Sequence, residues 1–321
     1  MILQFTYSDM KKFLSLYSAA YADFSTPRVA AIGVFDGVHP GHREIIRHAV
    51  RCSRELNAVP LAISFSPHPR QLFSPEQKFQ LLQSESDRHA QLLAAGAKES
   101  AVINFDHTVA NWEPEVFLEN LADNGLFPIA GICVGKLWHF GRNGRGDTGL
   151  LEKFCSEKKW SFAAVEELLC DGEIISSSSL RQAVKTGDLD KFFRLCGQYP
   201  CLTGKVTGGM HIAGSVLNSP TANLDISGGI LPPDGVYGAV VEFENRTAVA
   251  AVNIGLAPTF NVNTKRVEVH LLDFAGDLYG KNLKVFLRCF VRKEIKFDSA
   301  KALKNQIDKD IEFIRNNIIS R

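Results

Sequence analysis

The first half of the chain alternates between short apolar runs and longer amphipathic stretches. Four apolar runs predict buried strands, at residues 29–32, 61–65, 101–103 and 129–134. The stretches between them have the apolar spacing of helices, at residues 43–56, 86–95 and 114–122. Strands and helices in alternation predict a Rossmann-like α/β domain, whose mostly parallel sheet is covered by helices on both faces. Sheets of this kind bind ligands at the carboxyl ends of their strands.

After Arg181 the pattern changes to that of a small β-barrel. Two short helical runs come first, at residues 180–185 and 189–196. Extended runs separated by Gly, Pro and Asn follow, at residues 235–243, 247–254, 266–272 and 283–291. Short strands at this spacing predict an antiparallel barrel. We therefore expect an α/β domain over residues 1–185 and a barrel domain over residues 186–321.

The last stretch of the chain predicts an amphipathic helix. Ser299 is a suitable N-cap residue for it. Apolar residues recur at helical spacing on one face, at Leu303, Ile307, Ile311, Ile314 and Ile318. We predict that this stripe serves packing and not a binding site.

Composition narrows the class of protein. Of the 321 residues, 45% are apolar and 22% charged, which is typical of a soluble globular protein. The formal net charge of +1 gives no global attraction to nucleic acid or to an anionic membrane. No apolar stretch is long enough to span a bilayer, and the first residues do not resemble a signal peptide. Seven scattered cysteines without a C-x-x-C favour a reducing cytoplasm. Nothing in the sequence indicates an obligate protein partner.

The segment Gly33-Val34-Phe35-Asp36-Gly37-Val38-His39-Pro40-Gly41-His42 follows a predicted strand and precedes a predicted helix. Glycines here allow the backbone to approach a phosphate closely, and a helix N-terminus offers unpaired N–H groups. His39 and His42 are three residues apart, so both can point at one triphosphate. Imidazole donors would stabilise the charge that develops around the α-phosphorus during nucleotidyl transfer. The segment therefore predicts an ATP-binding nucleotidyltransferase. A zinc site is less favoured, because only Asp36 lies nearby as a further ligand.

Loops after the other predicted strands would emerge at the same edge of a parallel sheet. These loops are Ser66-Pro67-His68-Pro69-Arg70, Asn104-Phe105-Asp106 and residues 135–142. The stretch Arg142-Asn143-Gly144-Arg145-Gly146-Asp147 is basic and glycine-rich, which suits either anion contact or a solvated loop. Residues 176–181 supply hydroxyl groups and one guanidinium at a helix start, where a phosphate can bind.

These residues resemble the prokaryotic bifunctional riboflavin kinase/FAD synthetase family, over most of the chain. In the first half the shared motifs are Gly33-x-Phe35-Asp36-Gly37-Val38-His39-x-Gly41-His42, Pro67-His68-Pro69-Arg70 and Ser176-Ser177-Ser178-x-x-Arg181. In the second half they are Pro220-Thr221-Ala222-Asn223, Pro233-x-Gly235-Val236-Tyr237, Asn253-Ile254-Gly255-x-x-Pro258-Thr259-Phe260 and Val267-Glu268-Val269-His270-Leu271-x-Asp273-Phe274.

The resemblance implies two reactions in flavin cofactor synthesis. The barrel would phosphorylate riboflavin with ATP to give FMN, and the α/β domain would join AMP from a second ATP to FMN, giving FAD and pyrophosphate. The implied catalytic residues are His39, His42, Arg181 and Glu268, of which Glu268 accepts the proton of the ribityl hydroxyl. Implied ATP contacts are Gly33, Phe35, Asp36, Gly37, Gly41, Ser177 and Ser178. Implied flavin contacts are Pro67, His68, Arg70 and Asp106. Thr221 and Asn223 would hold Mg²⁺, for which neutral oxygen ligands are suitable.

One residue and one loop depart from the family pattern. The family usually has Asp or Asn where Leu137 stands. The kinase loop at residues 208–219 lacks the usual basic residue and has Asn218 in place of a glycine. These departures leave two alternatives to the bifunctional enzyme, namely retention of only one activity or a non-catalytic flavin-binding protein. A further alternative, nucleotidyl transfer to another phosphorylated acceptor, rests on the first domain alone.

Overall fold

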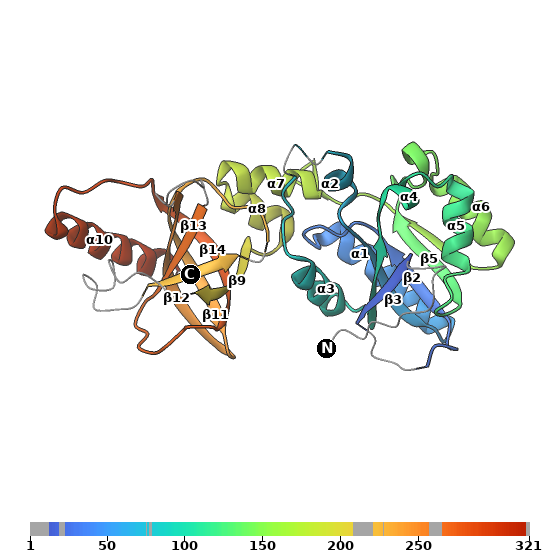
Figure 1. Cartoon of the computed structure of the whole chain (residues 1–321), viewed down its shortest axis with the longest axis horizontal. Coiled ribbons are helices and arrows are strands. Elements are labelled where there is room, and N and C mark those ends of the chain that lie inside the picture. The colour runs from blue at the N-terminus through green and yellow to red at the C-terminus, as the bar shows by residue number, and fades with distance from the viewer. Residues whose placement is uncertain are drawn as a thin grey trace. The chain divides into compact units, whose positions relative to one another are not determined.

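The computed structural model describes residues 13–18, 23–74, 76, 79–207, 221–226, 228–256 and 265–318. They belong to two compact units (Figure 1). Unit 1 comprises Met1–Phe79 and Glu85–Ser176, and unit 2 comprises Gln80–Ser84 and Ser177–Arg321.

Unit 1 is built on a six-stranded sheet of order β1-β4-β3-β2-β5-β6. Its strands are β1 Leu14–Ser18, β2 Arg28–Ile32, β3 Val59–Ser66, β4 Glu99–Asn104, β5 Ile129–Gly135 and β6 Ser161–Val165. Strands β2 to β6 run parallel, and β1 pairs antiparallel with β4 at one edge. The chain order changes direction between β2 and β5. In an open α/β sheet, ligands bind at such a switch point, beside the carboxyl ends of the strands.

Helices cover both faces of this sheet (Figure 1). They are α1 Pro40–Glu55, α2 Pro69–Phe73, α3 Glu85–Ala94, α4 His107–Ala110, α5 Pro114–Ala122 and α6 Thr148–Lys158. On β2, Ala30 and Ile32 face the core shared with α5 and α6, whereas Val29 and Ala31 face the core shared with α1 and α3. A strand buried on both faces is apolar at every position, which is what residues 29–32 are. The predicted α/β fold is confirmed.

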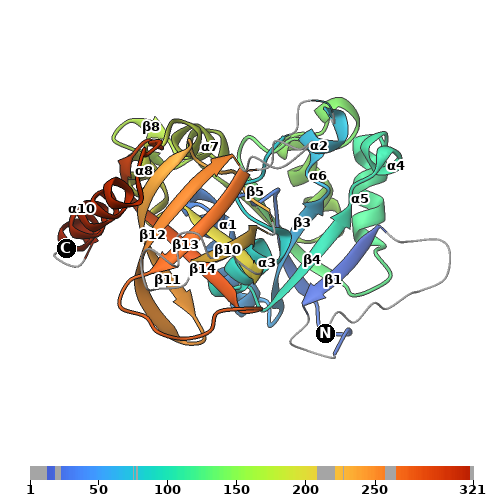
Figure 2. The ribbon, with the colours of Figure 1, turned by 60° about the vertical axis from the view of Figure 1, so that its left-hand side comes forward.

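Unit 2 begins with α7 Ser177–Thr186 and α8 Leu189–Cys196. A closed barrel of order β10-β13-β12-β11-β14-β9 follows, with every neighbouring pair antiparallel (Figure 2). Its strands are β9 Cys201–Thr207, β10 Ala222–Ile226, β11 Gly235–Phe243, β12 Arg246–Leu256, β13 Lys265–Leu271 and β14 Asn282–Arg292. Alternate residues of each strand fill the interior, as Val267 and Val269 do on β13. The predicted barrel is confirmed.

The C-terminal helix α10 spans Ala300–Ile318. The Ser299 hydroxyl accepts a hydrogen bond from the Ala302 amide at 3.2 Å, as an N-cap residue does. The predicted helix and its start are confirmed. In the part of the chain that the structure describes, no helix has both the length and the apolar character needed to cross a membrane.

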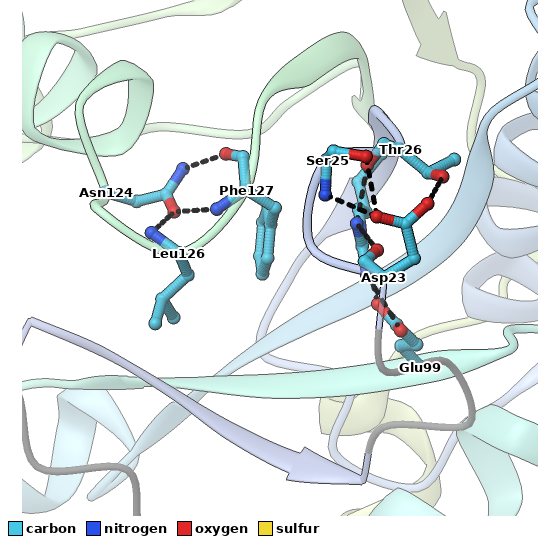
Figure 3. Close-up of polar contacts among 8 residues, drawn as sticks. Asp23, Ser25, Thr26, Glu99, Asn124, Leu126 and Phe127 are labelled. Carbon is cyan, nitrogen blue, oxygen red and sulfur yellow. Dashed lines mark hydrogen bonds and ion pairs between the residues drawn. The ribbon is translucent and has the colours of Figure 1, made fainter.

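A buried ion pair joins the first residues of β2 and β4. Arg28 Nε and Nη2 each donate to the Glu99 carboxylate at 3.0 Å, and both side chains are fully buried. The guanidinium also lies 5.0 Å from the centre of the Phe127 ring. Figure 3 shows Asn124 holding the backbone of Phe127, and Asp23 accepting hydrogen bonds in the turn before β2. The surroundings of this ion pair are therefore fixed by two hydrogen-bonded turns.

We predict that Arg28→Met lowers the free energy of unfolding by about 3–5 kcal/mol, because it leaves Glu99 charged and unpaired in the core. Urea unfolding followed by tryptophan fluorescence measures this, since all three tryptophans lie in unit 1. The double variant Arg28→Met/Glu99→Leu should recover much of the loss. Lys158→Met removes an exposed ion pair with Glu119 and should cost less than about 1 kcal/mol. A double variant as unstable as Arg28→Met would contradict the explanation.

Candidate active sites of the two units

The turn between β2 and α1 has an uncommon backbone conformation. Phe35, Gly37 and Val38 have φ angles of 55°, 86° and 35°. Such angles suit glycine but are costly for a β-branched residue such as Val38. The side chains of Phe35 and Val38 are almost completely buried, and this packing holds the turn in place. Because its side chain is buried, Phe35 can contact a nucleotide only through its backbone.

The turn brings the two predicted histidines together. Their rings stack with centroids 3.6 Å apart and an interplanar angle of 23°. The edge-on ring of Phe35 contacts His42 at a centroid distance of 5.2 Å. A Cβ atom at position 41 would lie 3.3 Å from the His39 ring, so Gly41 leaves room for that ring. His39 is the N-cap residue of α1, and Pro40 is the first helical residue. The pair thus lies at a helix N-terminus, where anions bind.

The His42 imidazole is neutral in the folded protein at pH 7. Burial, reinforced by His39 and Arg43, lowers its pKa well below 6.5. A neutral imidazole keeps one N–H donor, and its Nδ1 atom is buried without a hydrogen-bond partner among the described residues. Buried polar atoms are rarely left without a partner, so this atom is an exception within unit 1.

Two histidines whose pKa values are lowered make the stability of unit 1 depend on pH. Besides His42, the pKa of His89 is lowered to about 3, by burial and then by Arg88. Below pH 6.5 the unfolded chain binds protons on these residues and the folded chain does not. Above pH 6.5 these two histidines therefore do not lower the free energy of unfolding. It falls as the pH drops towards the folded pKa values, by at most about 1.4 kcal/mol per pH unit for each histidine.

We expect His89→Asn to reduce the loss of stability on acidification below pH 6.5. The measurement is urea unfolding at a series of pH values, followed by the fluorescence of Trp112, Trp138 and Trp160. His107→Asn, which replaces an exposed histidine of the same unit, is the matched control. An acid slope in His89→Asn equal to that of the unchanged protein would contradict the prediction.

The loop after β3 is ordered by His68. Its Nδ1 accepts a hydrogen bond from the Arg70 amide at 3.0 Å and caps α2, and its ring packs on Phe79. His68 is buried, whereas Pro67 and Arg70 are exposed. The loop thus exposes the side chains of Pro67 and Arg70, and the buried His68 orders it from within.

Asp106 lies at the carboxyl end of β4, as predicted, and caps a helix there. Its Oδ1 accepts a hydrogen bond from the Val109 amide at 2.8 Å, at the start of α4. In the basic loop after β5, Arg142 and Arg145 both lie within ion-pair distance of Glu113, at 3.6 and 3.3 Å. Glu113 therefore offsets part of the positive charge of this loop. Leu137 is 65% exposed.

No sequence pattern predicts the two contacts that tie α3 to the end of β3. Arg88 Nη2 donates to the Phe65 carbonyl at 3.2 Å, and the Ser66 hydroxyl donates to Glu85. Burial lowers the pKa of Arg88, and Glu85 and the buried Asp36 offset part of this lowering. Arg88 thus supports the loop after β3 and interacts electrostatically with Asp36 of the β2–α1 turn. No local signal marks it, because one arginine in an amphipathic helix is normally exposed.

A surface depression of about 720 Å³ lies along α1 in unit 1. Pro40 and Arg43 of α1 line it together with Ala164 and Val165 at the end of β6. It therefore begins at the first turn of α1, immediately after His39.

The predicted phosphate-binding residues Ser177, Ser178 and Arg181 belong to unit 2. They lie in the first half of α7, and Arg181 is 8% exposed. Within unit 1, the structure therefore brings together His39 and His42. The predicted phosphate contacts of α7 stay a prediction, because α7 belongs to the other unit.

The barrel carries the predicted kinase residues on its outer face. Asn223 and Asn253 both pair with Glu268 across neighbouring strands. Val267 and Val269 are buried, so Glu268 points outward, and Thr221 and Asn223 flank the buried Ala222 in the same way. Pro220, the loop at residues 208–219 and the motif residues 258–260 lie outside the described residues.

A cavity of about 490 Å³ adjoins these side chains. Thr221, Asn253 and Glu268 line its polar part, and Asn223 lies beside it in the β10–β13 register. Leu303, Ile307 and Ile311 of α10 line the apolar part. The prediction that the α10 stripe serves packing and not a binding site stays a prediction for these three residues, which line the cavity. They are only half-buried, whereas Ile314 is fully buried against the barrel.

The structure gives no direct evidence for the predicted metal. Among the described residues, no cluster of three or more His, Cys, Asp or Glu side chains could hold a metal ion. Thr221 and Asn223 are of other residue types and would bind a metal through neutral oxygens. Those oxygens suit Mg²⁺ when phosphate and water complete its coordination.

Comparison with known proteins defines the class of each unit. The FAD synthetase family model matches residues 22–179, and the riboflavin kinase family model matches residues 196–318. The fold and these two matches define a flavin nucleotide-forming transferase with two catalytic domains.

Relatives resemble the chain along nearly its whole length. The bifunctional riboflavin kinase/FMN adenylyltransferase of Pseudomonas fluorescens is 32% identical over 89% of this chain and 92% of the relative. That of Escherichia coli strain K12 is 31% identical over 88% and 90%. A crystal structure from Streptococcus pneumoniae, described as a macrolide-efflux protein, has a TM-score of 0.80 and 26% identity over 92% of this chain and 96% of that one. The chain belongs to the bifunctional riboflavin kinase/FMN adenylyltransferase family, which confirms the predicted resemblance.

Proposed function

We propose that the chain makes FAD from riboflavin in two ATP-dependent steps, with phosphorylation by the barrel followed by adenylylation by the α/β domain. The observation that supports this most strongly is the presence of two separate sets of side chains. One is the stacked histidine pair at the start of α1, and the other is the Glu268 cluster beside the barrel cavity. We place the boundary between the catalytic domains at residues 185 and 186, and we infer a cytoplasmic location from seven cysteines that form no disulfide.

In the adenylylation step, an FMN phosphate oxygen attacks the α-phosphorus of ATP. The bond from that phosphorus to the bridging oxygen of the leaving group breaks, and pyrophosphate departs. His39 and His42 donate hydrogen bonds to the phosphate oxygens whose charge increases in the transition state. The backbone of the Gly33–Gly41 segment surrounds the triphosphate. Pro67 and Arg70 contact the flavin, in a loop that His68 orders.

We assign the adenosine part of ATP to the depression along α1. This depression begins at Pro40, directly after His39, so a triphosphate held by the histidine pair can extend into it. Ala164 and Val165 provide small apolar side chains at its edge, which suits a planar base.

In the kinase step, the terminal hydroxyl of the riboflavin ribityl chain attacks the γ-phosphorus of ATP. Glu268 accepts the hydroxyl proton, the bond between the γ-phosphorus and the bridging oxygen breaks, and ADP leaves. Such a transfer depends on positioning and charge neutralisation, with one base for the hydroxyl. Thr221 and Asn223 would hold Mg²⁺, which would neutralise phosphate charge. The apolar α10 side of the cavity suits the flavin ring, and its polar side suits the ribityl chain.

A product assay tests the proposal. Incubation with riboflavin, ATP and Mg²⁺ should yield FMN and then FAD, which liquid chromatography separates. Incubation with FMN and ATP should yield FAD directly. If neither incubation gives a new flavin, the proposal is wrong.

One structural feature favours a kinase-only alternative. Leu137 exposes an apolar side chain on the loop after β5, where the family usually has a polar residue. If riboflavin gives FMN and supplied FMN gives no FAD, this alternative is the correct one.

A further inference from the structure

Helix α10 has one anchored part and one part that faces the cavity. Near its C-terminal end, Ile314 is fully buried, and a Cβ atom on Gly238 would lie 3.1 Å from its Cγ1 atom. Gly238 therefore lets the helix approach β11 closely. Earlier along the helix, Leu303, Ile307 and Ile311 are half-buried and line the cavity. Figure 2 shows α10 beside β12, with which it is in contact. The position of the cavity wall therefore depends on what fixes this earlier part.

An ion pair attaches this earlier part of α10 to the last residue of β14. Arg292 Nε lies 2.9 and 3.1 Å from the two Asp310 oxygens, and Nη2 lies 2.8 Å from Oδ2. Gln306, one helical turn earlier, donates to Asp310 Oδ1 at 2.9 Å. The Arg292 and Asp310 side chains are only 17% and 6% exposed. This bidentate geometry is the strongest form of such a pair.

The same contacts argue against a simpler role for Arg292. An arginine that lines a cavity beside a phosphoryl-transfer site is normally expected to bind phosphate. Here Nε and Nη2 bind Asp310, and Nη1 donates to the Lys293 carbonyl at 3.0 Å. The ring of Phe297 lies 5.7 Å from the guanidinium carbon. Each of the three nitrogens thus has a partner within the protein, and Asp310 neutralises the charge, which favours a role of Arg292 in holding α10.

We propose that the Arg292–Asp310 pair positions the apolar α10 wall and thereby sets the affinity of the cavity for the flavin ring of riboflavin. The inference rests on the proposed kinase function. A planar aromatic ring gains affinity from a close apolar wall, whereas ATP, which is bound through its phosphates, does not need that wall. The pair is therefore a positioning element for one substrate of the kinase step.

The test compares Arg292→Lys and Asp310→Asn with a matched control on the same helix. Arg315 forms an exposed ion pair with Asp273 at 2.7 Å, so Asp273→Asn removes an α10 ion pair that lies outside the cavity. We expect the riboflavin KM to rise about 10- to 100-fold in Arg292→Lys and Asp310→Asn, because a displacement of about 1 Å has effects of this size. The ATP KM and the adenylylation of supplied FMN should hardly change, and Asp273→Asn should behave like the unchanged protein.

Hydrogen exchange supplies a readout that does not depend on activity. In Asp310→Asn, the amides of residues 303–311 should lose protection while those of β11 and β12 keep it. Gln306→Ala, a milder change, should show the same pattern to a smaller extent and replaces Asp310→Asn if that variant does not fold. An unchanged riboflavin KM, an equal rise in both KM values or unchanged α10 protection would overturn the inference. Failure of the unchanged protein to form FMN would refute the proposed function instead, and the exchange result would still decide whether the pair holds α10.

Discussion

Replacing His42 by alanine is expected to slow FAD formation from FMN by about 10²–10³-fold, which is the typical effect of losing one transition-state donor. His42 stacks on His39 at the start of α1, and its buried Nδ1 has no partner among the described residues. FMN formation from riboflavin should hardly change, because Glu268 and the cavity belong to the other unit. Initial rates with FMN and with riboflavin, measured on the same preparation, give both numbers.

His107→Ala is the matched control for this experiment. His107 is an exposed histidine of the same unit, and it does not line the depression along α1. Its replacement should leave FAD formation close to that of the unchanged enzyme. Equal losses in FAD and FMN formation by His42→Ala would contradict the assignment of His42 to the adenylylation step alone.

Replacing Glu268 by glutamine should slow FMN formation and leave FAD formation from supplied FMN unchanged, the reverse of the effect of His42→Ala. The amide is similar in shape but cannot accept the ribityl hydroxyl proton, and loss of a general base typically costs about 10²–10⁴-fold in rate. FMN formation should fall by that factor, and adenylylation of supplied FMN should be intact. Steady-state rates of the two half reactions measure the effect.

Glu242→Gln serves as its control, because Glu242 is an exposed barrel glutamate that does not line the cavity. It should retain both activities. A normal rate of FMN formation in Glu268→Gln would exclude Glu268 as the base.

The sequence predicts the parts of this fold in which one residue type dominates. Residues 29–32 are apolar because β2 is buried on both faces, and Glu268 alternates with two valines because β13 has one face in the barrel core. Strand β6 was not predicted, since four of its five residues are partly or fully exposed and give no apolar run. Strands β1, β9 and β10 and helix α6 were missed as well.

The candidate sites were predictable only where their residues are close in sequence. His39 and His42 are such a pair, and the structure stacks them. Asp106 is a different case, because an Asp before a short helix is an ordinary capping signal, and capping is what it does. Arg292 and Asp310 meet only because a strand end and a helix pack together, which no local pattern indicates.

In the proposed function, two ATP molecules donate different phosphorus atoms, one in each unit. The most direct test gives the protein riboflavin with ATP labelled at either the γ- or the α-phosphorus and follows the label into separated flavins. We expect the γ-label to enter FMN and to be retained in FAD, and the α-label to enter FAD alone. Label from the α-phosphorus in FMN, or no label in any flavin, would contradict it.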